Sequence, residues 1–225
     1  PGQKKYYVVN NVLETFTSKV GQFVEIMNLE EFGNALFIDH EIQVAEKDEK
    51  IYSSTFFKSS YDLSKKINNV AIIGGGDGGV ARECLDNNTN YIDWYELDPE
   101  IVESCYRHLP TVCSKVKKSN TVNTFWGDAF ESIKSVGDSK YDKIFVDLND
   151  DQYCIDLARK NMNSLKRILK PGGVITAQVG SKDKKPKQVE NWCRVLEKSF
   201  GNVTITGVHI PSFDCNWNFA SSSMK

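Results

Sequence analysis

Five acidic residues of this 225-residue chain stand at or just beyond the ends of predicted β-strands. They are Asp77, Glu96, Asp128, Asp147 and Asp150. Because the carboxyl ends of parallel strands meet at one edge of a sheet, we expect these side chains to line one cleft. Any single one of them could equally cap a helix or a turn, but carboxylates crowded at one edge repel one another unless a cation lies between them. The pattern therefore indicates a ligand with positive charge and hydroxyl groups, such as a sulfonium nucleoside that reacts with an amine.

A glycine turn carries the first of these acids. It follows the apolar, strand-forming residues 70–73, and its glycines fit the pattern G-x-G-x-x-G at Gly74, Gly76 and Gly79. Such glycines let the backbone bend sharply and approach a ligand at a helix N-terminus. Glu96, at the end of the next predicted strand, stands where these folds bind a ribose diol. Asp77 inside the turn would repel a pyrophosphate, which favours a cationic or adenosyl ligand over a dinucleotide; the alternative is a turn that binds no ligand.

The elements that position these residues alternate between strand and helix from residue 66 onward, as expected for a doubly wound parallel sheet. Predicted strands cover residues 70–73, 90–95, 122–126, 141–146 and 174–179, and a terminal antiparallel pair covers 203–210 and 217–221. Predicted helices cover residues 80–85, 99–109, 129–136, 156–169 and 188–200. The sequence Lys-Pro-Gly-Gly at 170–173 is predicted to end the fourth of these helices, because proline and glycine cannot continue it.

The N-terminal part of the chain has a different pattern. Short strand-like runs at residues 6–9, 23–27, 35–38 and 41–44 are separated by turn residues, which predicts a small antiparallel β-domain. The charged residues 46–50 are interpreted as a solvated helix start and lead into a predicted helix at 51–57. We therefore expect an N-terminal β-domain, residues 1–50, and a Rossmann-like nucleoside-binding catalytic domain, residues 51–225.

Composition excludes several classes of protein. The formal net charge of −2 argues against nucleic acid as the main partner. No apolar run approaches the roughly 20 residues that span a bilayer, and the first residues contain no apolar signal core, so we expect no membrane partner and a cytoplasmic location. The six cysteines form no C-x-x-C pair and the three histidines are widely spaced. These spacings predict free, buried thiols and no metal site.

The chain resembles the spermidine and spermine synthases, the aminopropyltransferases, over nearly its whole length. The motifs that carry this resemblance are FGNALFID at 32–39, QVAEKDE at 43–49 with Tyr52, GGGDGG at 74–79, ELD at 96–98, GDA at 127–129, YDKIFVDLND at 141–150, and IPSF at 210–213 with Trp217. The glycine motif together with Asp-x-x-Asp after the fourth strand is fairly specific for this family. The C-terminal part is most similar to the spermine and thermospermine synthases.

The resemblance implies a fold, a reaction and a donor site. The implied fold is α/β, with a Rossmann-like class I methyltransferase-type sheet and a small N-terminal antiparallel β-domain, commonly assembled as a homodimer. The implied reaction transfers an aminopropyl group from decarboxylated S-adenosylmethionine, a co-substrate and not a prosthetic group, to putrescine or spermidine and releases methylthioadenosine. The residues implied in donor binding are Gln22, Gly74, Gly76, Asp77 at the ammonium, Glu96 at the ribose, and Asp128 with Ala129 at the adenine.

The resemblance also implies that Asp147, with Tyr52, orients and deprotonates the attacking amine, and that Asp150 lies near the donor or acceptor nitrogen. The chemistry is consistent with these roles. A sulfonium already carries its leaving group, so catalysis mainly requires in-line placement of the amine. An alkylammonium has a pKa near the lysine value of about 10.4, so a base must take its proton before it attacks. Phe213 and Trp217 either line the acceptor pocket or pack the terminal strands.

The chain departs from the family pattern in its acceptor half. Ser53 and Ser54 stand where the family usually has Gln or His followed by Glu, and Asp151 replaces a proline before a shortened loop. Two alternatives therefore remain open. One is an S-adenosylmethionine-dependent amine N-methyltransferase, because the same sheet hosts both reactions. The other is a non-catalytic homologue that binds nucleoside or partner subunits.

Overall fold

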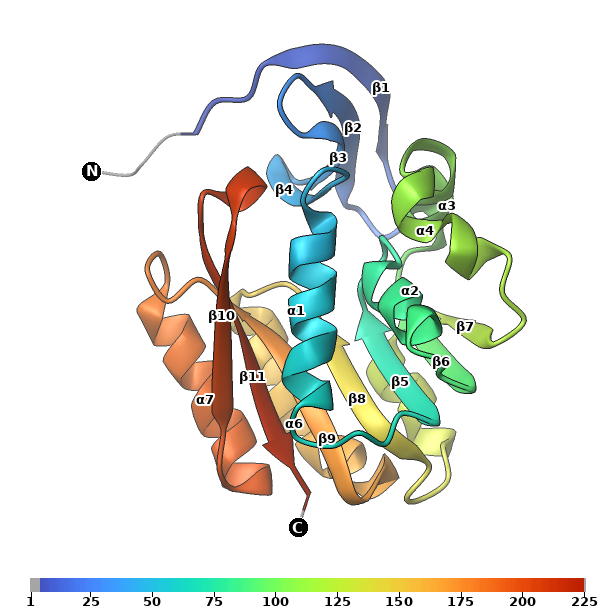
Figure 1. Cartoon of the computed structure of the whole chain (residues 1–225), viewed down its shortest axis with the longest axis vertical. Helices are drawn as coiled ribbons and strands as arrows, with labels where there is room; N and C mark the ends of the chain where they lie inside the picture. The colour runs from blue at the N-terminus through green and yellow to red at the C-terminus, as the bar shows by residue number, and fades with distance from the viewer. Residues whose placement is uncertain (1–4, 225) are drawn as a thin grey trace.

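The computed structural model describes residues 5–224 and contains two sheets (Figure 1). The smaller sheet is antiparallel, and its strands follow the order β1-β2-β3-β4. Their bounds are β1 (Val9–Thr17), β2 (Phe23–Leu29), β3 (Gly33–Ile38) and β4 (Glu41–Ala45). The predicted small antiparallel sheet is confirmed, but its first strand lies at 9–17 and not at 6–9. Register shifts after Val9 and after Val12 interrupt the alternation of side chains along β1, which conceals the strand in the sequence.

The larger sheet has seven strands in the order β10-β11-β9-β8-β5-β6-β7. The bounds are β5 (Asn69–Gly74), β6 (Tyr91–Glu96), β7 (Val122–Trp126), β8 (Tyr141–Asp147), β9 (Leu169–Gly180), β10 (Thr204–Ile210) and β11 (Cys215–Ser223). Strands β5 to β9 pair in parallel, and the β10–β11 hairpin pairs antiparallel to β9. The predicted Rossmann-like, class I methyltransferase-type sheet is confirmed. The chain proceeds from central β5 first to β6 and then, after β7, returns to β8, so a ligand crevice is expected beyond β5 and β8.

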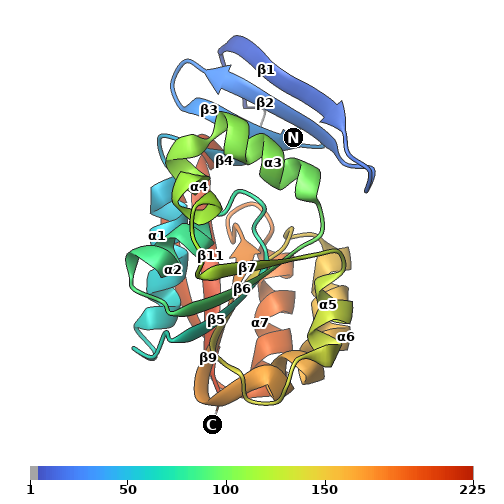
Figure 2. The same ribbon diagram turned by 90° about the vertical axis from the view of Figure 1, so that its right-hand side faces the viewer.

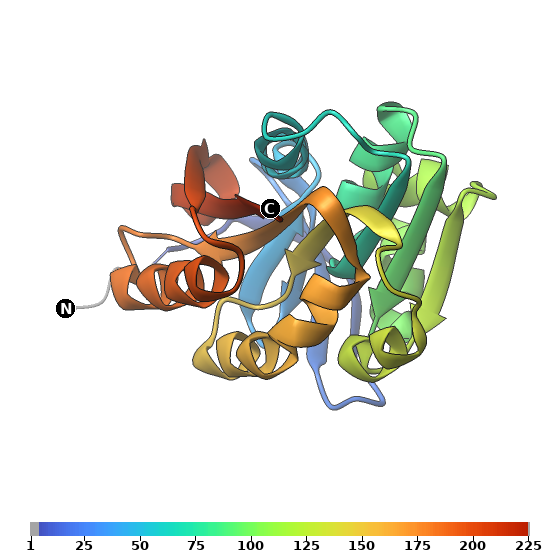
Figure 3. The ribbon, with the colours of Figure 1, turned by 90° about the horizontal axis from the view of Figure 1, so that it is seen from below.

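Seven α-helices accompany these strands in the described part of the chain. They are α1 (Glu49–Tyr61), α2 (Gly79–Asp86), α3 (Pro99–His108), α4 (Pro110–Lys117), α5 (Ala129–Ser132), α6 (Gln152–Ile168) and α7 (Pro186–Phe200). Short 3₁₀ helices cover η1 (Ile133–Ser135) and η2 (Pro211–Phe213). Helices α1 and α2 lie on one face of the large sheet and α5, α6 and α7 on the other (Figure 3).

Two helices differ from the sequence prediction. Helix α4 was not predicted; Pro110 begins it, because a proline lacks the N–H that the first helical position does not need. Helix α6 begins at Gln152 and not at 156, because the Asp151 side chain accepts a hydrogen bond from Cys154 N and caps the helix. The helix also ends at Ile168, so residues 170–173 form a bulge within β9 and do not end the helix themselves.

The apolar cores hold the small sheet over the carboxyl edge of the large one. Central β5 is buried on both faces, with Ile72 packed toward the α1 and α2 side and Ile73 toward the α6 side. A further cluster joins Val24 and Leu36 of the small sheet to Ile101 of α3 and Val112 of α4. Figure 2 shows α3 and α4 between the small sheet and the rest of the molecule. This packing places the small sheet beside the strand ends that carry the acidic residues.

Two further sequence expectations concern cysteines and membranes. All six cysteines are free, and Cys84, Cys105, Cys113 and Cys215 are buried, as predicted. Cys154 and Cys193 are only partly buried, so the prediction of buried thiols is wrong for these two. No helix within residues 5–224 is long and apolar enough to cross a membrane.

Candidate active site

The glycine turn closes tightly against the end of β8. Gly74, Gly75 and Gly78 have positive φ values of 80°, 73° and 79°, a conformation that side chains disfavour. A Cβ atom on Gly74 would lie 2.3 Å from the backbone oxygen of Asp147, and Gly75 N donates to that same oxygen at 3.0 Å. The turn therefore needs glycine both for its backbone conformation and for its close approach to β8.

Two carboxylates lie at this turn, Asp77 within it and the buried Glu96 beside it. Asp77 Oδ1 accepts a hydrogen bond from Gly79 N at 2.6 Å, and Glu96 Oε1 accepts one from Asp98 N at 3.0 Å. A Cβ atom on Gly76 would lie 3.5 Å from Glu96 Oε2, so this glycine lies directly beside the carboxylate. Burial raises the pKa of Asp77 to about 7, with a further contribution from the charge of Asp147. Burial also raises the pKa of Glu96 to about 7.

Asp147 and Tyr52 form a hydrogen-bonded pair. Asp147 ends β8, Tyr52 lies in the first turn of α1, and the Tyr52 hydroxyl donates to Asp147 Oδ1 at 2.6 Å. Burial raises the pKa of Asp147 to about 6, although the hydrogen bond from Tyr52 opposes the shift. Burial and the neighbouring charge of Asp147 raise the pKa of Tyr52 well above its ordinary value. The pair leaves Asp147 Oδ2 available to a second hydrogen-bond donor.

The remaining predicted donor residues lie at the ends of neighbouring elements. Asp128 Oδ1 accepts from Phe130 N at 2.8 Å and so caps α5, which begins at Ala129. Asp128 therefore caps a helix, which was one of the two interpretations of each acidic residue. Its other carboxylate oxygen can still contact a ligand. Gln22 lies in the β1–β2 turn, which contacts the start of α3 where Lys19 N donates to Glu100 Oε2 at 2.7 Å.

Asp150 lies on the opposite side of this edge, near the end of β9. Its Oδ2 atom is 3.3 Å from Lys185 Nζ, and a Cβ atom on Gly180 would lie 2.7 Å from the same oxygen. An ion pair therefore occupies Asp150 in this structure. The structure brings Tyr52, Asp77 and Asp147 together and places Asp150 at the side.

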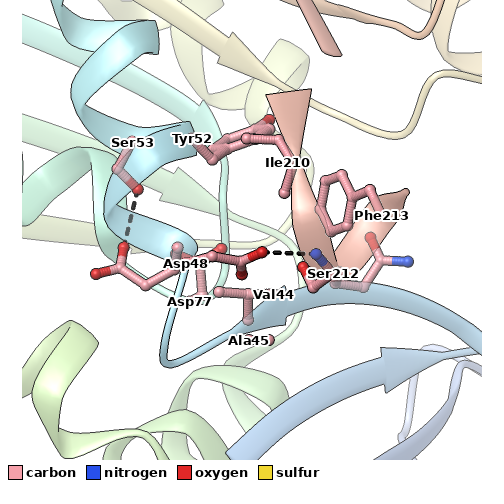
Figure 4. Close-up of a pocket in the computed structure, with 11 residues that line it drawn as sticks. Val44, Ala45, Asp48, Tyr52, Ser53, Asp77, Ile210, Ser212 and Phe213 are labelled. Carbon is pink, nitrogen blue, oxygen red and sulfur yellow. Dashed lines mark hydrogen bonds between the residues drawn. The ribbon is translucent and has the colours of Figure 1, made fainter. Parts of the chain in front are cut away.

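A narrow cavity opens between α1, β4 and the turn at the tip of the β10–β11 hairpin (Figure 4). The residues that line it are Gln43, Val44, Ala45, Asp48, Glu49, Tyr52, Ser53, Asp77, Ile210, Ser212 and Phe213. Phe213 thus lines the cavity. Trp217 packs behind it, with ring centroids 5.0 Å from Phe213 and 6.5 Å from Tyr52. The assignment of these two aromatic residues to an acceptor pocket stays a prediction.

The cavity contains acidic residues that the sequence analysis missed as site residues. Asp48 and Glu49 are only 4% and 7% exposed, so the interpretation of residues 46–50 as a solvated helix start is wrong for these two. The buried Arg82 guanidinium forms an ion pair with Glu49, and Ser53 Oγ donates to Glu49 Oε2 at 3.1 Å. Arg82 lies in α2, 33 residues from Glu49 along the chain, so the sequence alone does not show that these two side chains pair. The available signal was the QVAEKDE motif, which already carried the family resemblance.

Comparisons with known proteins agree with this geometry. A family model described as "Spermine/spermidine synthase domain" matches residues 49–225. The polyamine aminopropyltransferase of Korarchaeum cryptofilum (strain OPF8) is 29% identical over 225 residues, which cover 99% of this chain and 70% of the relative. The enzyme of that name from Prochlorococcus marinus (strain NATL1A) is 32% identical over 210 residues, which cover 89% of this chain and 72% of the relative.

Solved structures show the same fold. A spermidine synthase in complex with the transition state analogue AdoDATO superimposes with a TM-score of 0.91 at 20% identity, covering 97% of this chain and 75% of that protein. The spermidine synthase from Thermotoga maritima gives a TM-score of 0.90, also at 20% identity and with the same coverage. The family predicted from the motifs is thereby confirmed. From its sequence match, its relatives and its architecture, this chain belongs to the spermine/spermidine synthase family.

Proposed function

We propose that this chain transfers an aminopropyl group from decarboxylated S-adenosylmethionine to a polyamine and releases methylthioadenosine. The observation that carries the proposal is the Tyr52–Asp147 pair, which lies at the same sheet edge as Asp77 and Glu96. The curated relatives are named polyamine aminopropyltransferases, which supports the same reaction. An edge with three carboxylates of raised pKa suits substrates that bring positive charge.

The donor nucleoside binds across the ends of β5, β6 and β7. Glu96 accepts hydrogen bonds from the two ribose hydroxyls through its two carboxylate oxygens. Gly76 lies directly beside this carboxylate and has no side chain, so the ligand can approach it. Asp128 and Ala129 contact the adenine at the start of α5, and Gln22 approaches from the β1–β2 turn. Asp77 binds the ammonium of the aminopropyl group. The carboxylate of intact S-adenosylmethionine would meet like charge there, which favours the decarboxylated donor.

Asp147 acts as the general base. Tyr52 donates to one of its oxygens, so the other oxygen accepts a proton from the attacking amine. The freed nitrogen lone pair attacks the aminopropyl methylene carbon that is bonded to sulfur. A C–N bond forms, the bond between this carbon and sulfur breaks, and its electron pair stays on the sulfur of methylthioadenosine. Burial strengthens Asp147 as a base by raising its pKa to about 6, closer to that of the amine.

The acceptor side comprises Asp150, Phe213 and Trp217. Asp150 exchanges its contact with Lys185 for an ammonium group of the acceptor or donor. Phe213, with Trp217 packed behind it, forms an aromatic wall next to Tyr52, which suits the methylene chain of a polyamine. Ser53 and Ser54 leave this side with smaller side chains than the family usually has. We expect this difference to change the choice of amine and to leave the reaction type unchanged.

The test is mass spectrometry of reactions with decarboxylated or intact S-adenosylmethionine, each combined with putrescine, spermidine or spermine. Methylthioadenosine and an amine longer by one aminopropyl unit, formed only from the decarboxylated donor, would establish the proposal and name the acceptor. S-adenosylhomocysteine formed from the intact donor would replace it with methyl transfer. Binding of nucleoside without any product would replace it with a non-catalytic role.

We also propose a division into two domains at residues 1–50 and 51–225, a homodimer, and a cytoplasmic location. Strand β1 is an edge strand of the small sheet with exposed Val9 and Val12, which suits a contact between two copies. Light scattering of the purified protein tests the homodimer, and limited proteolysis tests the domain division.

A further inference from the structure

Asp48 occupies the N-cap position of α1 but does not cap that helix. An Asp at this position normally accepts a hydrogen bond from a backbone N–H in the first helical turn. Here the side chain makes no such bond, and its Oδ2 atom accepts one from Ser212 N, 164 residues away, at 2.6 Å. Figure 4 shows this bond between the start of α1 and the hairpin turn. Asp48 is therefore committed to the cavity wall and not to its own helix.

The other carboxylate oxygen of Asp48 has no partner. Among residues 5–224, neither Asp48 Oδ1 nor Ser212 Oγ finds a hydrogen-bond partner, although both atoms are shielded from solvent and both residues line the cavity. Asp48 also forms no ion pair with a Lys, Arg or His in this part of the chain. The neighbouring Lys5 Nζ donates instead to the backbone oxygens of Pro211 and Ser212, each at 2.8 Å. A buried carboxylate oxygen and a buried hydroxyl, on two residues joined by a hydrogen bond, can therefore both interact with a ligand that donates hydrogen bonds.

The surroundings define the chemistry of that ligand. The other acids of the cavity already have donors, because Arg82 and Ser53 contact Glu49, and Gly79 N contacts Asp77. Apolar walls beside Asp48, including Val44 and Ala45, suit an alkyl chain and disfavour a hydrated metal ion. A primary ammonium is about as small as a water molecule, carries a positive charge and has three donors. It can donate both to Asp48 Oδ1 and to a lone pair of Ser212 Oγ within this narrow space.

We propose that Asp48 and Ser212 form an ammonium-binding subsite of the cavity, which binds the terminal primary ammonium of an aliphatic amine substrate. The identity of the amines rests on the proposed function: the ammonium belongs either to the aminopropyl group of the donor or to the acceptor. Because Asp48 also holds the turn that carries Phe213, ligand binding and the position of the aromatic wall are linked through one residue. Asp48 is therefore a specificity residue for charged amine ends.

The decisive variant is Asp48→Asn. An asparagine oxygen still accepts from Ser212 N, so the turn stays in place while the negative charge is lost. Isothermal titration calorimetry should measure three ligands: methylthioadenosine, decarboxylated S-adenosylmethionine, and putrescine or spermidine in the presence of saturating methylthioadenosine. We expect one ammonium-bearing ligand to bind about 10- to 100-fold more weakly and methylthioadenosine to bind unchanged. A loss confined to the decarboxylated donor assigns the subsite to its aminopropyl ammonium, and a loss confined to the amine assigns it to the acceptor.

Two further variants separate this subsite from general electrostatics. Ser212→Ala removes only one neutral acceptor, so we expect a smaller loss, about 3- to 10-fold, for the same ligand. Asp214→Asn removes a charge from the same hairpin outside the cavity, at a φ of 51° that Asn tolerates well, and should leave all three affinities unchanged. Thermal unfolding of each variant checks the fold. If Asp48→Asn fails to fold, the Ser212→Ala titration decides the question.

The outcomes separate this inference from the proposed function. Folded Asp48→Asn protein with unchanged affinity for every ammonium ligand overturns the subsite, as does a wild-type protein that binds no ammonium ligand. A wild-type protein that binds amines through Asp48 but yields no product keeps the subsite and overturns aminopropyl transfer. Equal weakening of methylthioadenosine and of the amines in Asp48→Asn also overturns the subsite, because it shows a distorted site.

Discussion

The two sides of the active site are built in different ways. The core of the donor side is a continuous stretch of backbone, in which the glycine turn, the end of β6 and the start of α3 follow one another within about 30 residues. The cavity side is assembled from distant segments: Asp48 and Tyr52 meet Ser212 and Phe213 of the hairpin. On the first side the glycine turn and the end of β6 fix where the Asp77 and Glu96 carboxylates lie, whereas on the second side the side chains are positioned by contacts between distant segments. The second side can therefore change its ligand while the first stays the same.

The residue that joins both sides should show the largest effect. Asp147 contacts the glycine turn through its backbone oxygen and Tyr52 through its side chain. Asp147→Asn keeps the shape but removes the base, so we expect kcat to fall about 100- to 10,000-fold. Affinity for methylthioadenosine, measured by calorimetry, should stay within a few-fold. An equal loss of turnover and nucleoside affinity would show that Asp147 supports the fold of the turn instead.

A substitution that distorts the backbone of the glycine turn should lower the free energy of unfolding. Gly74→Ala places a Cβ atom 2.3 Å from the Asp147 backbone oxygen at a φ of 80°, so we expect the free energy of unfolding to fall by roughly 3 kcal/mol or more. Gly137→Ala is the matched control, because a Cβ atom there meets nothing within 4 Å. Urea unfolding measures both. Equal stability of the two variants would contradict the close approach.

Glu96→Gln should separate nucleoside binding from amine chemistry. The amide accepts only through one oxygen, so a ribose diol loses part of its charge-assisted hydrogen bonding. We expect about 10-fold weaker binding of methylthioadenosine, and kcat at saturating donor should change little. Calorimetry and steady-state kinetics test the two parts. A fall in kcat alone would place Glu96 in the chemical step.

Tyr52→Phe should have the opposite effect to Glu96→Gln, with a lower kcat and an unchanged affinity for the nucleoside. It removes the hydrogen bond to Asp147 Oδ1 but keeps the ring against Phe213 and Phe219. We expect kcat to fall about 10-fold without a change in methylthioadenosine affinity. The loss should be smaller than in Asp147→Asn, since the base itself remains. A variant with wild-type kcat would remove Tyr52 from the mechanism.

The clustered carboxylates also predict how stability depends on pH. The folded pKa values of Asp77 and Glu96 (about 7) and of Asp147 (about 6) lie above the ordinary carboxyl range, mainly through burial. The folded state therefore binds protons more tightly than the unfolded state between about pH 4 and 7, and these groups lower stability as pH rises through that window.

Asp77→Asn removes one of these groups, so its melting temperature relative to wild type should be higher at pH 8 than at pH 5. Spermidine should stabilise wild type more at pH 8 than at pH 5, because deprotonated carboxylates attract the cation. Differential scanning calorimetry measures both effects. A difference between variant and wild type that stays constant with pH would contradict the raised pKa of Asp77.

The same contrast explains what could be predicted from the sequence. The glycine turn, Glu96 and Asp147 follow buried strands directly, so their shared edge could be inferred from strand order alone. Asp48 and Ser212 could not, since each is an ordinary polar residue until the hairpin turn lies on α1. Helix α4 was not predicted, because a proline begins it, and the bounds of strand β1 were predicted wrongly, because register shifts interrupt its pattern.

The tip of the hairpin has a consequence for how the protein folds. Lys5 Nζ donates to Pro211 O and Ser212 O, and the Tyr7 hydroxyl donates to Ser212 O at 2.7 Å, so the turn is held by residues more than 200 positions earlier. A contact between residues so far apart in the sequence requires closure of a long chain segment before the contact stabilises the fold. We expect the parallel strands and the donor edge to form first and the cavity last. The protein would thus acquire its nucleoside site before its amine site.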